Sequence, residues 1–148
     1  MADQQNGFIR VYCDIETKKK LNYTYFLING KKEGESRIYY QNGQVCEVCN
    51  FINNKKEGEY KSYYGNGQVS TVCYYKNDKK EGKYKLYHEN GEIWLTCNYK
   101  DGKIEGECKS YYKNGQLMEI CNYKNGKMEG EYKKYDRDGQ LKETGYYS

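Results

Sequence analysis

The chain has 148 residues, of which 25 are basic and 21 acidic, so its net charge of +4 comes without a block of like charge. This balance fits neither an acidic tail nor a strongly basic nucleic-acid-binding protein. No stretch approaches the roughly 18 apolar residues of a membrane-spanning helix, and the first residues do not resemble a cleaved secretion signal.

Two features of the composition shape the prediction of the fold. Only 22 residues are Ile, Leu, Val or Phe, as in many disordered chains, yet 20 are tyrosine. A tyrosine ring is a large apolar surface with a polar tip, so tyrosines can build a core where aliphatic residues are scarce. Seven cysteines, an odd number, without a recognisable secretion signal predict reduced thiols and a cytoplasmic protein. The lysine-rich, proline-free composition is typical of an AT-rich genome.

Residues 1–27 are predicted as irregular N-terminal strands that cap a repeat array. They do not follow the period that begins at residue 28, and the segment 17–20 stands where a turn is expected. Residues 28–148 contain five copies of a 24-residue unit in constant phase. The Glu-Gly pairs end at Gly34, Gly58, Gly82, Gly106 and Gly130, and a tyrosine column consists of Tyr39, Tyr63, Tyr87, Tyr111 and Tyr135.

Each unit predicts a strand, a two-residue Asn-Gly turn and a second strand. Strict alternation along the second strand would place Val69, Cys73 and Tyr75 on one face and Ser70 on the other. Successive hairpins then form an all-β fold, which is an elongated, single antiparallel meander of about 12 strands.

Taken together, the segments 123–130 and 135–139 show the order aromatic, Asn-Gly, Glu-Gly, aromatic, Asp-Gly. This unit resembles the MORN repeat (membrane occupation and recognition nexus) in its second, slightly longer variant. The resemblance implies a non-enzymatic β-hairpin array that acts in scaffolding, dimerisation or attachment to membrane lipids. Repeats of this kind also occur in bacterial antitoxin-like proteins and in giant viruses. One departure is the column Cys49, Cys73, Cys97 and Cys121, where the better-known form has glycine, which returns only at Gly145.

The cysteine column is predicted to pack rather than to bind metal or form disulfides. Equivalent residues of consecutive hairpins lie two strands apart, about 9.6 Å, whereas a disulfide tolerates at most about 7 Å between Cα atoms. Thiolate ligands of zinc must also lie much closer than this. If Tyr112 pairs with Leu117, Cys108 lies directly across from Cys121. A bridge there is geometrically conceivable, although a reducing cell favours free thiols.

The tyrosine columns could form a stacking platform for bases, but we interpret them as the core of a thin sheet. The basic column consists of Arg37, Lys61, Lys85, Lys109 and Lys133. It lies one strand position from the acids Glu35, Glu59, Glu107 and Glu131, so nucleic-acid binding is not expected. The only histidine, His88, replaces a tyrosine beside a turn and is interpreted as a surface residue.

No phosphate-binding loop, nucleophile elbow or isolated carboxylate pair is present, so no catalytic, metal or cofactor residues are predicted. The pattern breaks at Trp94 and Met118, whose column otherwise holds small or charged residues. If Tyr87, Trp94, Tyr111 and Met118 share an exposed face, they form an apolar patch for a partner.

The sequence therefore predicts a scaffold that binds a protein partner or associates with itself, for instance through an open sheet edge. One alternative is an adaptor that binds anionic lipid through its lysine-rich corners, which would place a cytoplasmic protein at a membrane surface. Another alternative is an antitoxin-like inhibitor of a partner enzyme.

Overall fold

The computed structural model describes residues 6–12 and 21–148, which contain strands and turns but no helix. The strands are β1 (Gly7–Tyr12), β2 (Leu21–Ile28), β3 (Lys31–Tyr39), β4 (Val45–Ile52), β5 (Lys55–Tyr63), β6 (Val69–Lys76), β7 (Lys79–Lys80), β8 (Gly82–Tyr87), β9 (Ile93–Lys100), β10 (Lys103–Ile104), β11 (Gly106–Tyr111), β12 (Leu117–Lys124), β13 (Lys127–Met128), β14 (Gly130–Tyr135) and β15 (Leu141–Tyr147).

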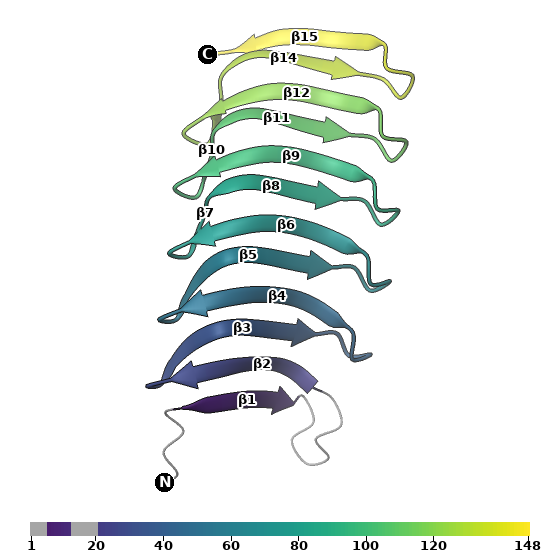
Figure 1. The fold of residues 1–148 in the computed structure, drawn as a ribbon. Helices are drawn as coiled ribbons and strands as arrows, with labels where there is room; N and C mark the ends of the chain where they lie inside the picture. The colour runs from purple at the N-terminus through teal and green to yellow at the C-terminus, as the bar shows by residue number, and fades with distance from the viewer. Residues whose placement is uncertain (1–5, 13–20) are drawn as a thin grey trace.

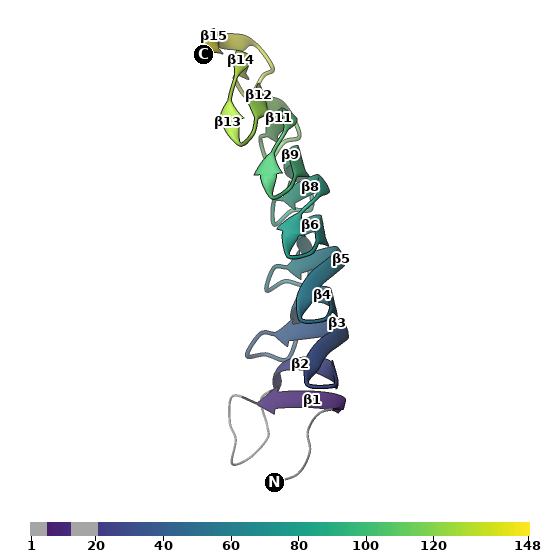
Figure 2. The same cartoon turned by 90° about the vertical axis from the view of Figure 1, so that its left-hand side faces the viewer.

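All strands belong to one open antiparallel sheet (Figure 1). Its path follows chain order from β1 to β15, with the two-residue strands β7, β10 and β13 beside β6, β9 and β12. The predicted all-β meander is confirmed, and its main path has 12 strands. Seen from the side, the sheet is a single layer along its whole length (Figure 2).

β1 and β2 precede the first repeat and extend the same sheet, since β2 pairs with β3. The part of the predicted cap at 1–5 and 13–20, including the irregular segment 17–20, lies outside the described residues.

Two kinds of turn connect the strands. The corners between repeats are two-residue loops in which both residues have positive φ, as at Asn53 (51°) and Asn54 (68°). The Asn-Gly tips within repeats are three-residue loops, since the Tyr112 N–H donates to the Gln116 carbonyl at 2.9 Å and the Gly115 N–H donates to the Tyr112 carbonyl at 2.9 Å. A positive φ of 82° at Gly115 completes this loop.

The predicted two-residue turn at Asn114-Gly115 is therefore wrong. Leu117 pairs with Tyr111 instead of Tyr112, and a β-bulge follows the tip. Asn-Gly suits both loops, because a type I turn followed by a left-handed glycine is also a common hairpin connection. Cys108 still lies directly across from Cys121, because the register beyond the bulge is the one expected.

The bulge also changes which residues share a face. Ser70 is the additional residue, because Tyr63 pairs with Val69 whereas Ser62 pairs two positions further on. The Ser70 and Ser62 hydroxyls are 2.8 Å apart, so these side chains share a face, and Val69 lies with Tyr63 on the other. The strict alternation predicted for Val69 and Ser70 is wrong for this reason.

We call the face that carries the cysteine column and Ser62 the cysteine face. Its core consists of the most buried apolar side chains, which are Cys49, Cys73, Cys97, Cys108 and Cys121. Half-buried tyrosines cover them in cross-strand pairs, with ring centroids 5.6 Å apart for Tyr60 and Tyr75 and 5.3 Å apart for Tyr84 and Tyr99. The predicted packing of the cysteine column is confirmed, and tyrosines complete this core. The column of Tyr63 and Tyr87, which was also predicted in the core, lies on the opposite face.

The opposite face carries the basic column, and we call it the ion-pair face. In four of the five repeats, the basic residue contacts the acid two positions earlier on the same strand, as expected from the sequence. The distances are 2.7 Å for Arg37 and Glu35, 2.5 Å for Lys61 and Glu59, 2.5 Å for Lys109 and Glu107, and 3.3 Å for Lys133 and Glu131.

Hydrogen bonds join each repeat to the next at both ends of the hairpins. At the tips, the Tyr64 hydroxyl donates to the Tyr87 carbonyl at 2.6 Å, and Asn90 Nδ2 donates to the Lys113 carbonyl at 2.9 Å. Equivalent tip donors are Tyr40, Tyr112, Asn66 and Asn114. At the corners, backbone N–H groups of the following corner donate to Glu33, Glu57, Glu81 and Glu105.

The fifth repeat differs at both tip positions. Asp136 and Asp138 replace the tyrosine and the asparagine, and a carboxylate cannot donate to a following carbonyl. Asp136 instead accepts from the backbone N–H groups of Asp138 and Gln140 and pairs with Lys142 at 3.2 Å. The last tip therefore makes its hydrogen bonds within its own repeat.

Candidate functional site

The tip of the third repeat carries unusual residues at two facing positions, and the fourth repeat carries one at the second of them. In the third repeat, His88 takes the place of the tip tyrosine, and its Nε2 lies 3.0 Å from the Tyr111 carbonyl oxygen. Because a carbonyl only accepts, Nε2 must carry a proton. His88 thus keeps the hydrogen bond between repeats, and its interpretation as a plain surface residue was incomplete.

The residue six positions after the tip residue packs against it in the third and fifth repeats. The His88 and Trp94 rings stack with centroids 5.8 Å apart, and the corresponding pair of the fifth repeat is Asp136 with Lys142. The column that contains Trp94 has Cys46, Ser70, Met118 and Lys142 in the other repeats. Large apolar side chains thus occur at this position only in the third and fourth repeats.

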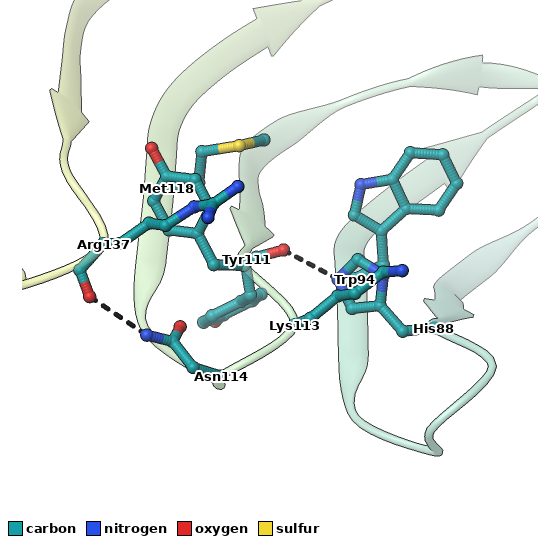
Figure 3. A pocket seen from close by; sticks show the side chains of 8 residues that line it. His88, Trp94, Tyr111, Lys113, Asn114, Met118 and Arg137 are labelled. Carbon is teal, nitrogen blue, oxygen red and sulfur yellow. Dashed lines mark hydrogen bonds between the residues drawn. The ribbon is translucent and has the colours of Figure 1, made fainter.

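Trp94 and Met118 line a hollow of about 400 Å³, which we call the Trp94 hollow. Its other lining residues are His88, Tyr111, Tyr112, Lys113, Asn114 and Arg137. Figure 3 shows Trp94 with His88 on one side and Met118 with Arg137 on the other. Trp94 is 43 % exposed, so a large part of its ring faces solvent.

The charged side chains that line the Trp94 hollow are all positive. Lys113 and Arg137 are basic, and none of the lining residues is acidic. The Arg137 guanidinium lies 5.8 Å from the centre of the Tyr112 ring. The backbone carbonyl of Arg137 accepts a hydrogen bond from Asn114 Nδ2 at 3.0 Å. The hydrogen bond to Asn114 holds the backbone of Arg137 against the fourth-repeat tip.

The structure brings together part of the predicted patch. Trp94 and Met118 lie in one hollow, and Tyr111 provides the carbonyl oxygen that binds His88. Tyr87 lines a different hollow with Val69 and Val72 on the ion-pair face. Tyr111 occupies the same column as Tyr87, so its ring points to that face as well. Sequence reasoning missed His88 and Arg137 because their approach to Trp94 and Met118 depends on the bulge and on contacts between repeats.

The corner lysines, which suggested a lipid-binding surface, lie partly against the sheet. The ammonium groups of Lys56 and Lys80 lie 5.0 Å from the ring centre of Tyr60 and 4.6 Å from that of Tyr84, respectively. Lys32 lies 4.8 Å from the Tyr25 ring centre in the same way. These charges therefore also contribute cation–π contacts within the fold.

The chemistry of the cysteine face is that of a packed interior. Burial raises the pKa of Cys73, and it raises the pKa of Cys121 to about 11 and that of Tyr84 to about 12. Cys97 is the exception, since a hydrogen bond with the Cys108 thiol lowers its pKa. Cys108 and Cys121 are free thiols. Protonated, buried thiols of this kind are poor nucleophiles.

Among residues 6–12 and 21–148, no group of three or more His, Cys, Asp or Glu side chains is arranged to hold a metal ion. The same residues include no helix that is long and apolar enough to cross a bilayer.

The model of the MORN repeat variant matches residues 32–53, 56–77, 80–101, 104–125 and 128–148, which are five consecutive units. The chain belongs to the MORN repeat variant family. MORN repeats are a non-enzymatic module and generally act as scaffolds that bind proteins or membranes. None of the curated protein sequences compared with the chain matches it.

Proposed function

We propose that this MORN-repeat chain is a non-enzymatic cytoplasmic scaffold that binds a protein partner through the Trp94 hollow. The observation that carries the proposal is the exposed Trp94–Met118 pair, which occurs where other repeats place Cys46, Ser70 or Lys142. Aromatic and methionine side chains are enriched in the cores of protein interfaces.

The charge of the hollow supports one kind of partner. An apolar side chain would fill the space beside Trp94, and neighbouring carboxylates would face Lys113 and Arg137. We therefore propose a partner segment with a large apolar residue flanked by acidic residues. Electrostatic complementarity of this kind speeds association and makes it sensitive to salt.

The experiment compares two labelled peptides, one with phenylalanine flanked by glutamates and one with phenylalanine flanked by lysines, by fluorescence anisotropy. Trp94→Ser with Met118→Ser is a suitable double variant, because Ser70 already occupies the same column. The control is Tyr146→Ser, which removes a 75 % exposed ring from the last strand.

We expect the acidic peptide to bind more tightly than the basic one, with at least a tenfold loss in the double variant and none in Tyr146→Ser. Equal binding of both peptides, or an unchanged affinity in the double variant, would refute the proposed surface. The same variants in a pull-down from the host then show whether the native partner uses this surface, and whether it is an enzyme, as in the antitoxin-like alternative. Salt-sensitive binding to anionic vesicles, with no affinity for either peptide, would favour the membrane adaptor instead.

A further inference from the structure

The ion-pair face is neutralised in four repeats but not in the third. At the position of Glu35, Glu59, Glu107 and Glu131, the third repeat carries Lys83. Within the described residues, neither Lys83 nor its neighbour in the basic column, Lys85, has an acidic group within ion-pair distance. Two positive charges therefore replace an ion pair at this point of the sheet.

Two hydrogen-bonding side chains face these lysines from the next strand. In the register of β8 and β9, Lys83 lies opposite Asn98 and Lys85 lies opposite Thr96. Directly opposite residues have Cβ atoms about 4.5–5.5 Å apart, and residues two apart on one strand are separated by about 6.8 Å. The four side chains line a hollow of about 230 Å³. Glu107 also borders it, but its carboxylate is already paired with Lys109 at 2.5 Å.

This arrangement matches the chemistry of an oxyanion. Two ammonium groups, a hydroxyl and an amide converge on one small space, and each can donate a hydrogen bond. A phosphate monoester carries about −1.5 to −2 charges and three acceptor oxygens, whereas a carboxylate carries one charge and two oxygens. Two adjacent lysines are therefore better matched by a phosphate.

A second, apolar hollow lies on the same face, on the other side of β8. Val72 lies opposite Lys85, and Tyr87 follows Lys85 by two residues. Together with Val69 and the tip glycines, they line a space of about 440 Å³. An extended peptide advances about 6.8 Å in two residues, which is the step from the level of Lys85 to that of Tyr87.

We propose that the ion-pair face of the third repeat binds a phosphorylated peptide segment, with the phosphate between Lys83 and Lys85 and an apolar side chain two positions away against Val69 and Val72. A lipid headgroup has the same phosphate chemistry but no side chain at this fixed spacing, so the apolar hollow favours the peptide. The site lies on the opposite face from the Trp94 hollow and does not depend on it.

The test is fluorescence anisotropy with a labelled peptide in which phosphoserine is followed, two positions later, by leucine. The comparison peptides carry unphosphorylated serine or replace the leucine with glycine. Lys83→Glu is an informative variant, because it restores the residue of the other four repeats and the fold already accommodates glutamate there. Glu59→Lys is the opposite change and tests the lysine pair alone, because Tyr74 and Val72 face these positions in the second repeat instead of Asn98 and Thr96.

We expect phosphorylation to increase affinity at least tenfold, replacement of leucine to reduce it, and Lys83→Glu to remove the gain from phosphorylation. Glu59→Lys should leave the stoichiometry at one peptide per chain, because the second repeat lacks the facing amide and hydroxyl. Equal binding of the phosphorylated and unphosphorylated peptides, or full binding by Lys83→Glu, would overturn the proposal. Binding to vesicles that contain phosphatidic acid, without affinity for the phosphopeptide, would overturn it in favour of a lipid site.

Discussion

The hydrogen bond between Tyr64 and the next repeat allows a direct test of how the array is held together. The Tyr64 hydroxyl donates to the Tyr87 carbonyl at 2.6 Å from a half-buried position. Tyr64→Phe removes the donor and keeps the ring. Because an intramolecular hydrogen bond contributes a net 0.5–1.5 kcal/mol, we expect the free energy of unfolding to fall by about 1 kcal/mol.

The same bond recurs at Tyr40 and Tyr112, with distances of 2.5 Å and 2.9 Å. These sites lie in different repeats and share no partner, so their effects should add. The triple variant, with Phe at Tyr40, Tyr64 and Tyr112, is therefore expected to lose about 3 kcal/mol. In a repeat array this loss falls on the interfaces between neighbours, so the unfolding transition should also become less cooperative.

Urea unfolding followed by circular dichroism measures both effects. Tyr74→Phe is the control, because Tyr74 is 45 % exposed and its hydroxyl makes only a 3.4 Å contact with Glu59. This control should leave the midpoint unchanged. A triple variant that loses less than about 1 kcal/mol, or a control that loses as much as Tyr64→Phe, would refute the role assigned to the tip tyrosines.

Three further predictions concern the cysteine face. Cys73 is 1 % exposed, so Cys73→Leu should overpack it and cost about 1–3 kcal/mol in urea unfolding. Ile52→Leu at a 53 % exposed corner should cost nothing measurable, and equal effects would contradict tight packing. Burial raises the pKa of Tyr84 and Tyr123 to about 12, above the value near 10 of an unfolded chain, so the folded state retains these protons longer. Their contribution to stability should be complete below about pH 10 and be lost as the pH rises through 12; urea midpoints that stay constant over this range would contradict it. A soluble maleimide should modify half-buried Cys46 in the native protein and spare the buried Cys49, Cys73, Cys97, Cys108 and Cys121 until unfolding, as peptide mass spectrometry would show. Early labelling of Cys97 would contradict this prediction.

Much of the fold could be predicted because the sequence repeats. A constant 24-residue phase makes every repeat pair in the same way, so one strand–turn–strand unit predicts the whole meander. The register that places Cys108 across from Cys121 also follows from the sequence. The tip loop could not be predicted, because Asn-Gly is compatible with a two-residue loop and with a three-residue loop that adds a bulge.

The candidate site depends on the feature that was predicted incorrectly. The bulge brings the column of Ser70 and Trp94 to the cysteine face, whereas strict alternation would place it with Val72 on the ion-pair face. Tyr87 and Tyr111 point to the ion-pair face, because they follow Lys85 and Lys109 by two residues on the same strands. The sequence marked Trp94 and Met118 as exceptions to the pattern, but their neighbours His88 and Arg137 became visible only in three dimensions.

By itself, the sequence determined the period, the order of the strands and the columns that recur in every repeat. These properties follow from local turn residues and from side chains that alternate along a strand. The tertiary structure decided which face each tip residue occupies and which groups join neighbouring repeats. Those contacts link residues about one period apart, and their geometry depends on the loop conformation, so the spacing of residues in the sequence does not specify them.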